Sequence, residues 1–436
     1  MQWATRALIA RRLAAALIFV GPQLGAQQIT RIERSRGFTM LNVVRQDIEK
    51  NYFDSPYGGI DLKAVFDSAH ARIEAADRLE QVLATIANAT LSLNDSHTAF
   101  VPPRLTYGAE YGFDMRFVGD TCRIVNVKPG SDAEAKGMRM GDALLAVGGG
   151  TLTRKNLWQF LYAVNAIQPR AGLALSLQSP GGPPREVYAR AKVVERRRIV
   201  DPSSSFDLLE LIREGQNDWE KDAPRYVDVA NRIVVSRPNA FYGYNSWIDD
   251  VMDRARNREA MVIDLRGNHG GSVNALLRLI GRFYENDLTV GTEKLRDKTR
   301  QMIAKGAGKD RYAGALVVLV DAESASASEI FARTVQLTNR GKVIGDRTAG
   351  AVRGSFGYFH TIGTEMLIVY GASVTISDLI LPDGGKLEHV GVTPDELMLP
   401  TGEDIAAGSD PVLAHALTLL GVPFTPKDAG ALRLRK

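Results

Sequence analysis

An apolar stretch that changes abruptly into a row of small side chains constrains the fold of this chain most. Residues 315–320 read Ala-Leu-Val-Val-Leu-Val, and residues 321–329 continue as Asp-Ala-Glu-Ser-Ala-Ser-Ala-Ser-Glu. An uninterrupted β-branched and apolar run is typical of a strand that is buried on both faces, as in a parallel sheet. The apolar residues from Ile330 to Leu337 then recur with helical spacing. The pattern predicts a buried strand, a sharp serine-bearing turn and a helix.

A serine in that turn has two interpretations. The N-terminus of a helix holds unpaired backbone N–H groups, which can stabilise the negative oxygen that forms when a hydroxyl attacks a carbonyl. Ser326 would then be a nucleophile, and the N–H of Ala327 would be an oxyanion donor. However, Ser326 followed three residues later by Glu329 is also a capping box, which requires no chemistry. Capping serines are the commoner kind, so the rest of the chain must decide.

A second strand–turn–helix unit lies upstream. Residues 260–283 run from an apolar strand through the turn Arg-Gly-Asn-His-Gly-Gly-Ser into an amphipathic helix. Adjacent glycines let backbone amides approach a ligand closely, so Gly270 and Gly271 are candidates for a second oxyanion donor. Taken alone, the pair also fits an ordinary tight turn. A further strand and turn at 342–351 follow the serine helix, and this order favours parallel strands.

These three segments, in this order, resemble the C-terminal processing peptidases, also called tail-specific proteases. That family carries a D-L-R-x-N-x-G-G turn and an S-A-S-A-S-E segment, which stand here at 264–271 and 324–329. The resemblance implies a serine peptidase that forms an acyl-enzyme, with Ser326 as its nucleophile. The third family motif, G-E-x-T-x-G-K, ends in the lysine that acts as general base, and Ala351 occupies that position. Because a serine hydroxyl is a poor nucleophile without a base, either another group acts or the site is inactive.

A replacement base stands much earlier in the chain. The dipeptide Ser96-His97 resembles the arrangement in the tricorn-type branch of the same superfamily, where histidine is the base and a glutamate near the C-terminus completes the relay. The matching position here is Glu388. We therefore predict His97 as general base and acid, oriented by Glu388 directly or through Ser96. His269, in the glycine turn, is the second candidate base, and His389 is an alternative to Glu388.

Residues 107–195 carry a second resemblance. The segment that begins Gly112-Phe113-Asp114 alternates apolar and polar residues, which is typical of an exposed strand. Downstream, the chain matches the P-G-S-x-A and G-x-x-x-G-D-x-L-x-x-V signatures of PDZ domains of bacterial proteases. This resemblance implies that an extended peptide adds to the domain as a strand, while backbone amides near Gly112, Phe113 and Asp114 hold its terminal carboxylate. A plain small β domain is the alternative interpretation.

The length of the chain predicts several domains, because 436 residues exceed what one hydrophobic core supports. The expected fold is a multidomain protein of the α+β and α/β classes. Its serine-peptidase core is expected to resemble the ClpP and crotonase folds, with an N-terminal helical segment and an inserted PDZ-like β domain. The expected boundaries are a signal peptide at 1–26, a helical segment carrying His97 at 27–106, the PDZ-like domain at 107–195, the core at 196–425 and a tail at 426–436.

The N-terminus is typical of an export signal. Arg6, Arg11 and Arg12 precede the apolar residues 13–20, and Leu-Gly-Ala at 24–26 suits signal peptidase. The apolar stretch is too short to cross a bilayer. We therefore expect a periplasmic or secreted protein with no stable membrane span.

Charge and cysteine content argue against several classes of protein. The 54 basic and 50 acidic residues give a net charge of +4, which is too small and too dispersed to favour nucleic-acid binding. One cysteine, and no histidine pair at ligand spacing, argue against a zinc mechanism, so neither a metal nor another cofactor is expected. Protein or peptide substrates are the expected partners, and the oligomeric state is not predicted.

The predicted function is therefore that of a serine endopeptidase that cleaves exported proteins and recognises a peptide C-terminus. Two other classes stay open. The first is a catalytically inactive member of the same fold that binds a peptide or lipid in its cleft, which the alanine at position 351 supports. The second is a crotonase-like acyl enzyme, since that fold also surrounds an oxyanion with paired backbone amides. The PDZ-like segment argues against this second class.

Overall fold

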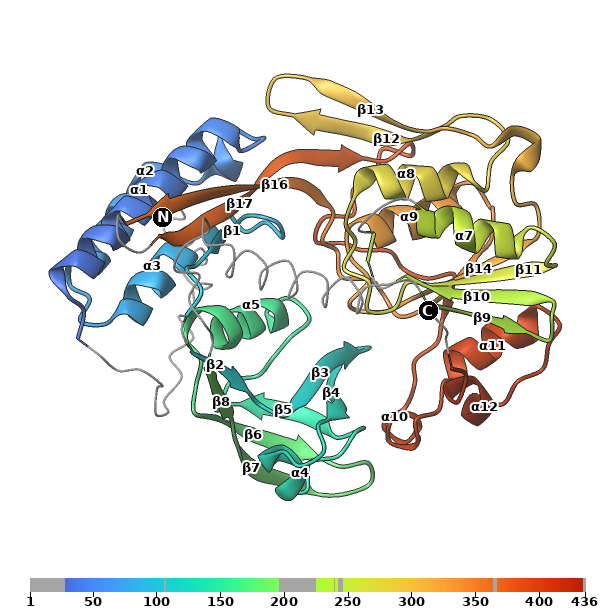
Figure 1. Ribbon diagram of the computed structural model, residues 1–436, viewed down its shortest axis with the longest axis horizontal. Helices are drawn as coiled ribbons and strands as arrows, with labels where there is room; N and C mark the ends of the chain where they lie inside the picture. The colour runs from blue at the N-terminus through green and yellow to red at the C-terminus, as the bar shows by residue number, and fades with distance from the viewer. Residues whose placement is uncertain are drawn as a thin grey trace, which may run out of the picture.

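The computed structural model describes residues 28–105, 107–195, 225–238, 240–241, 246–363 and 367–433. The predicted signal peptide and the predicted start of the core at 196–224 lie outside these ranges. The structure contains helices together with both antiparallel and parallel sheets (Figure 1). The prediction of a fold that mixes helices and sheets is therefore confirmed. Among the described residues, no helix combines the length and the apolar character needed to cross a bilayer.

A parallel sheet forms the centre of the larger lobe. Its strand order is β18-β15-β14-β11-β10-β9, and all neighbours pair in parallel except β9 and β10. The parallel pairing expected for the strand before Ser326 is thus confirmed. The strands are β9 (Arg225–Val229), β10 (Ile233–Arg237), β11 (Ala260–Asp264), β14 (Ala315–Val320), β15 (Lys342–Gly345) and β18 (Glu396–Leu397).

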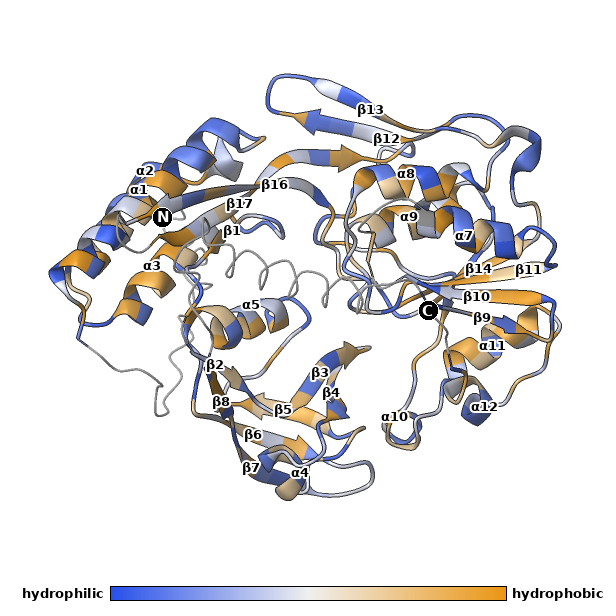
Figure 2. Cartoon of the chain, in the orientation of Figure 1, coloured by the Kyte–Doolittle hydropathy of each residue, from blue (hydrophilic) through white to orange (hydrophobic). Residues whose placement is uncertain are grey.

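Helices cover both faces of this sheet, which explains the unbroken apolar sequence of β14. Val318 and Val320 pack toward one face, whereas Val317 and Leu319 pack toward the other. Figure 2 shows the resulting hydrophobic strands between two helical layers. The first layer consists of α7 (Ser246–Ala255), α8 (Val273–Gly281) and α9 (Ala327–Leu337), and the second of α11 (Pro411–Leu419) and α12 (Pro426–Gly430). Helix α12 belongs to the segment predicted as a tail, and its Ala429 is buried against the core.

An antiparallel sheet joins the N-terminal helices to the larger lobe. Strand β17 pairs with β16 along its length, with β1 near its start and with β12 near its end. The pairing of β1 with β17 brings residues from before the 107–195 segment against residues from after it. The members of this sheet are β1 (Ala99–Val101), β12 (Leu288–Leu295), β13 (Thr299–Ala304), β16 (Arg353–Ile362) and β17 (Ile368–Ile380).

Three helices pack on this sheet and hold the loop that carries His97. They are α1 (Arg31–Asn51), α2 (Leu62–Glu74) and α3 (Leu79–Leu91), with the short turn η1 (Tyr57–Gly59) between the first two. Apolar residues at helical spacing, such as Val44 and Ile48 of α1, form one buried cluster with Tyr370 and Ala372 of β17. Helix α3 then ends, and the chain passes through residues 92–98 into β1. The loop is therefore anchored at both ends.

Residues 107–195 form a separate small lobe with its own hydrophobic cluster. Its antiparallel sheet has the order β3-β4-β5-β6-β7, so β3 is an edge strand, and β2 pairs with β8 beside it. The strands are β2 (Tyr107–Glu110), β3 (Phe113–Val118), β4 (Thr121–Val127), β5 (Ala143–Val147), β6 (Gly172–Gln178), β7 (Pro184–Arg190) and β8 (Lys192–Glu195). The helices are α4 (Asp132–Ala135) and α5 (Leu157–Tyr162), which continues as η2 (Ala163–Ile167). The short elements η3 (Gly308–Asp310) and α10 (Gly402–Ala407) lie in the larger lobe.

Candidate active site

Ser326 is the last residue of the turn from β14 into α9 and has a strained backbone. Its φ of 55° and ψ of −117° lie in a region that residues other than glycine rarely adopt. Such a conformation costs about 1–3 kcal/mol and persists only where surrounding contacts impose it. Here the Ser326 N–H donates to the Ala351 carbonyl at 2.9 Å and to the Glu329 carboxylate at 3.1 Å. A strained strand-to-helix turn that exposes a serine is typical of a nucleophile and is not needed for a cap.

The two neighbouring serines of the same segment have structural partners. Ser324 and Ser328 are both 0% exposed, whereas Ser326 is partly exposed. The Ser324 hydroxyl donates to the Leu265 carbonyl at 2.8 Å, and the Ser328 hydroxyl donates to the Asn268 carbonyl at 2.9 Å. These bonds fasten the serine turn to the glycine turn that follows β11. Of the three serines, Ser326 is the one that solvent reaches.

The glycine turn brings free backbone donors beside Ser326. The N–H groups of Gly271 and Ala327 have no hydrogen-bond partner among the described residues. The N–H of Gly270, by contrast, donates to the Asn268 side chain at 2.8 Å. The prediction of Gly270 as an oxyanion donor is therefore wrong, because its N–H is already engaged. Gly270 instead lets the glycine turn pack closely against the serine turn. A Cβ at this position would lie 2.7 Å from the Ser326 Cβ and 2.9 Å from the Ala327 nitrogen.

The fold brings together three polar residues from opposite ends of the chain, Ser96, His97 and Glu388. The Ser96 hydroxyl lies 2.6 Å from Nδ1 of His97 and 2.9 Å from Oε2 of Glu388. The Ser96 N–H also donates to Oε1 of Glu388 at 3.0 Å. Glu388 is buried, whereas Ser96 and His97 are half-buried. The contact between Glu388 and His97 therefore runs through Ser96.

This chain of contacts defines which nitrogen of His97 is available as a base. The Glu388 carboxylate can only accept hydrogen bonds, so the Ser96 hydroxyl donates to it and accepts from Nδ1–H of His97. Nε2 is then left with its lone pair. Burial lowers the pKa of the His97 imidazole, although the charges of Glu388 and Asp95 oppose that effect. The ring is therefore neutral at pH 7 and able to accept a proton.

The loop that carries His97 is fixed by an acid and an arginine that sequence reasoning missed. Buried Asp95 accepts from the N–H groups of His97 at 2.8 Å and Thr98 at 2.7 Å, and from the Thr375 hydroxyl at 2.8 Å. Arg353 lies 3.6 Å from Asp95 and 3.9 Å from Glu388, so its charge offsets both carboxylates. An aspartate two residues before a functional histidine is the pattern of an Asx-turn, and that signal was available in the sequence.

The loop that contains Ala351, at the position of the family lysine, connects Ser326 to Glu388 through its backbone. The Ala351 carbonyl accepts from the Ser326 N–H, and the Val352 N–H donates to Glu388 at 2.8 Å. Among the described residues, no hydrogen bond joins the Ser326 hydroxyl to His97. Catalytic hydrogen bonds of this kind often form only when substrate is bound.

The other predicted histidines stand outside the relay. His269 is exposed and lies near Glu323, whose pKa is raised by burial. His389 is also exposed, and its Nε2 lies 2.9 Å from the Asn94 carbonyl and 3.6 Å from Glu388. Neither is hydrogen-bonded to Ser326 among the described residues. In the same part of the chain, no group of three or more His, Cys, Asp or Glu side chains could hold a metal ion.

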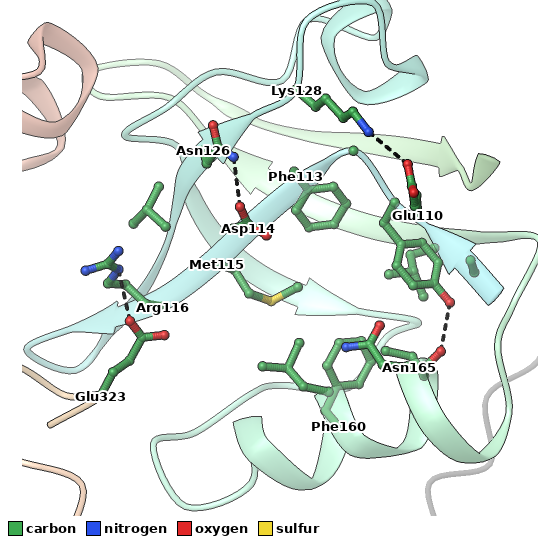
Figure 3. Close-up of a pocket in the computed structure, with 17 residues that line it drawn as sticks. Glu110, Phe113, Asp114, Met115, Arg116, Asn126, Lys128, Phe160, Asn165 and Glu323 are labelled. Atoms are coloured by element: carbon green, nitrogen blue, oxygen red, sulfur yellow. Dashed lines mark hydrogen bonds and ion pairs between the residues drawn. The ribbon is translucent and has the colours of Figure 1, made fainter. Parts of the chain in front are cut away.

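The predicted peptide-binding residues line a cavity of about 610 Å³ in the small lobe (Figure 3). Gly112 precedes the edge strand β3, which begins with Phe113 and Asp114, and α5 with η2 forms the opposite wall. The floor is apolar and the rim is charged or polar. The apolar residues include Phe113, Met115, Phe160, Val164 and Leu173. The rim holds the pairs Lys128–Glu110 and Asn126–Asp114, each at 2.8 Å, and Arg116–Glu323 at 3.5 Å.

Glu323 of that last pair belongs to the larger lobe and precedes Ser326 by three residues. Arg116 also contacts Asp321 at 3.2 Å, and Asp321 in turn accepts from the Gly267 N–H at 2.9 Å. The cavity therefore opens beside the segment that carries the candidate nucleophile.

Comparison with known proteins identifies a peptidase domain in the chain. Residues 237–398 match the model of peptidase family S41. The tail-specific protease of Haemophilus influenzae is 25% identical over 339 residues, which are 73% of this chain and 46% of that protein. The chloroplastic carboxyl-terminal-processing peptidase 2 of Arabidopsis thaliana is 25% identical over 388 residues, or 84% and 71% of the two chains. The chain thus spans about half the length of the first relative and nearly three quarters of the second.

Solved structures show the same fold. Mature CPAF superposes with a TM-score of 0.63 at 15% identity, over 86% of this chain and 94% of that one. The photosystem II D1 C-terminal processing protease gives a TM-score of 0.51 at 19% identity, over 86% and 94% of the two chains. Together with the turn motifs at 264–271 and 324–329, these likenesses show that the chain contains a family S41 peptidase domain at residues 237–398 and is similar over most of its length to the C-terminal processing peptidases.

Proposed function

We propose that this protein is a serine endopeptidase that uses a Ser-His-Glu arrangement in place of the serine–lysine pair of its family. The observation that carries the proposal is the relay from Glu388 through Ser96 to His97, which supplies a neutral imidazole where the family lysine is missing. Ser326, in its strained turn, is the nucleophile. A site that had lost its base would have no need to keep a buried glutamate, a hydroxyl and an imidazole aligned.

The proposed reaction follows from the roles of these groups. The Ser326 hydroxyl attacks the scissile carbonyl while Nε2 of His97 takes its proton. The free N–H groups of Gly271 and Ala327 stabilise the oxyanion of the tetrahedral intermediate. His97 then gives the proton to the departing amine, which leaves an acyl-enzyme on Ser326. Water, deprotonated by the same imidazole, hydrolyses this ester and releases the enzyme.

The small lobe is proposed to recognise the substrate as a PDZ-like domain. Among the described residues, edge strand β3 pairs with a strand on one side only, so a peptide could pair along its other side, facing α5 and η2. Backbone amides around Gly112, Phe113 and Asp114 would receive the terminal carboxylate, and the apolar floor would take the last side chain. The core behind it is proposed to be of the ClpP and crotonase type, and the domain boundaries are proposed as given above.

This arrangement predicts a dependence on the free carboxylate of the peptide. In Ser326→Ala protein, which should bind but not cleave, a peptide with an apolar C-terminal residue should bind about tenfold more tightly than its C-terminal amide, because hydrogen bonds to a charged group contribute about 1.5–3 kcal/mol. Fluorescence anisotropy with a labelled peptide measures both affinities. Equal affinity for the acid and the amide would contradict carboxylate recognition in this cavity.

Substrates are proposed to be exported proteins, since residues 1–26 have the sequence of an export signal and the protein would act in a periplasm or outside the cell. The activity itself is tested by labelling with a fluorophosphonate, which reacts with activated serines. Purified wild-type protein should be labelled, and Ser326→Ala should not. Labelling that survives this substitution would place the reactive residue elsewhere. A wild-type protein that is never labelled would instead favour an inactive, ligand-binding member of the family.

A further inference from the structure

Glu329 makes more contacts than a helix cap requires. Its side chain is 0% exposed in the first turn of α9, and its carboxylate accepts four hydrogen bonds. One oxygen accepts from the N–H groups of Ser326 at 3.1 Å and Ala351 at 2.9 Å. The other accepts from the N–H of Gly350 at 2.8 Å and from the hydroxyl of Thr348. One carboxylate therefore holds both the nucleophile's backbone and the loop that faces it.

The same loop is also bonded to the segment that carries Glu388. The Val352 N–H donates to the Glu388 carboxylate at 2.8 Å, and the His389 N–H donates to the Gly350 carbonyl at 2.7 Å. The Thr348 hydroxyl, which donates to Glu329, accepts from the Val392 N–H at 2.6 Å. Residues 348–352 thus form a backbone bridge between Ser326 on one side and Glu388 on the other.

We propose, on the basis of the function proposed above, that Glu329 is a positioning residue that fixes the bridge 348–352 and thereby sets Ser326 relative to the Glu388–Ser96–His97 relay. In relatives this loop ends in the lysine that serves as base. Here Ala351 contributes its backbone alone: its N–H is held by Glu329, and its carbonyl holds the Ser326 N–H. The loop therefore acts through its backbone contacts, and the relay supplies the base.

The electrostatics of Glu329 give this role a pH dependence. All four partners donate, and the ionised carboxylate is the form that accepts from all of them at once. These partners are uncharged and come from α9's own N-terminus and from the bridge, while Glu388 and Arg353 lie beyond the bridge. Burial raises the pKa of Glu329 from 4.5 to about 7, against the effect of the hydrogen bonds. Protonation would place an O–H where the carboxylate now accepts, so that it either faces a backbone N–H or requires the Thr348 hydroxyl to turn and accept it. Both outcomes change the contacts of the bridge.

The same pKa separates positioning from stability. Because the folded-state pKa lies above the unfolded value of 4.5, this group favours the folded state fully below pH 4.5, and the advantage is lost as the pH rises through about 7. At pH 8 the ionisation of Glu329 therefore does not stabilise the folded state. Its contribution at this pH is to position the groups that it contacts. A neutral substitute should impair Ser326 more than it impairs the fold.

Glu329→Gln is the direct test, because the glutamine amide places N–H groups against backbone N–H groups. We expect the fluorophosphonate labelling rate of Ser326 at pH 8 to fall about 100-fold, the effect of displacing a reacting group by about 1 Å, while the melting temperature changes by only a few degrees. The acid side of the pH–rate profile should move from near pH 7, set by Glu329, to below about 6.5, set by His97.

Glu33→Gln is the matched control, since Glu33 forms the same local capping box with Thr30 at the exposed start of α1. It should label at the wild-type rate. Should Glu329→Gln not fold, Thr348→Val removes one arm of the bridge without a change of volume and should slow labelling about tenfold. Folded Glu329→Gln or Thr348→Val protein that labels at the wild-type rate, with an unmoved acid limb, would overturn the proposal. An unlabelled wild-type protein would instead refute the peptidase function itself.

Discussion

His97→Ala is expected to lower the rate of fluorophosphonate labelling of Ser326 at pH 8 by about 10³-fold or more, the scale of losing the general base of a catalytic triad. The substitution removes the nitrogen that takes the Ser326 proton, and the family lysine is not present to replace it. The fold should survive, because the His97 side chain is only half-buried and its loop is held through the backbone by Asp95. The measurement is the second-order labelling rate, with the melting temperature as a check on folding.

His269→Ala is the control for this prediction. His269 is the second candidate base from the sequence, yet it is exposed in the glycine turn and is not hydrogen-bonded to the relay among the described residues. Its removal should leave the rate within about twofold, as for most surface substitutions. If His269→Ala abolished labelling while His97→Ala retained it, the assignment of the base would be reversed.

Gly270→Ala should destabilise the protein and displace Ser326, because this glycine packs directly against the serine turn. The φ of Gly270 is 93°, and an added Cβ would lie 2.7 Å from the Ser326 Cβ and 2.8 Å from the Ala325 carbonyl oxygen. Backbone atoms cannot yield as a flexible side chain can, so either the turn or Ser326 must move. We expect about 2–3 kcal/mol of destabilisation from strain and overpacking, and about a 100-fold slower labelling of Ser326. Denaturant unfolding and the labelling rate measure the two effects.

Gly267→Ala separates crowding from backbone strain. Gly267 lies in the same turn with a φ of 73°, but the nearest atom to its added Cβ would be a carboxylate oxygen of Glu323 at 3.8 Å. It should therefore cost about 1 kcal/mol from its backbone conformation alone and leave the labelling rate nearly unchanged. If Gly267→Ala and Gly270→Ala changed the stability and the labelling rate equally, crowding against Ser326 would not explain the need for glycine at position 270.

The sequence predicted the elements around Ser326 well because local patterns encode them. The apolar run of β14 requires burial on both faces, and the structure places helices there. The small side chains that follow leave room for the close packing of the serine turn on the glycine turn. What a local pattern cannot encode is which backbone donor is already engaged. Gly270 was indistinguishable from Gly271 until the Asn268 side chain was seen to occupy its N–H.

Long-range partners were harder to predict than local motifs. The meeting of Ser96 with Glu388, 292 positions later, followed from a family resemblance, because no rule of spacing pairs residues so far apart. Asp95 and Arg353 were missed for the same reason: their importance depends on the antiparallel sheet that brings β1 and β16 to β17. Glu329 was visible as a cap, but its bonds to the 348–352 bridge depend on how that loop folds back over α9.

The pH dependence of fluorophosphonate labelling at Ser326, with the labelled residue identified by mass spectrometry, tests the central claim most directly. The account predicts that the label lies on Ser326 and that its rate rises from acid pH to a plateau by about pH 8, then stays flat through the alkaline range, because a neutral imidazole is the base. A rate that climbs steadily above about pH 8, as for a base with the pKa of an amine, or a label on any other residue, would contradict it.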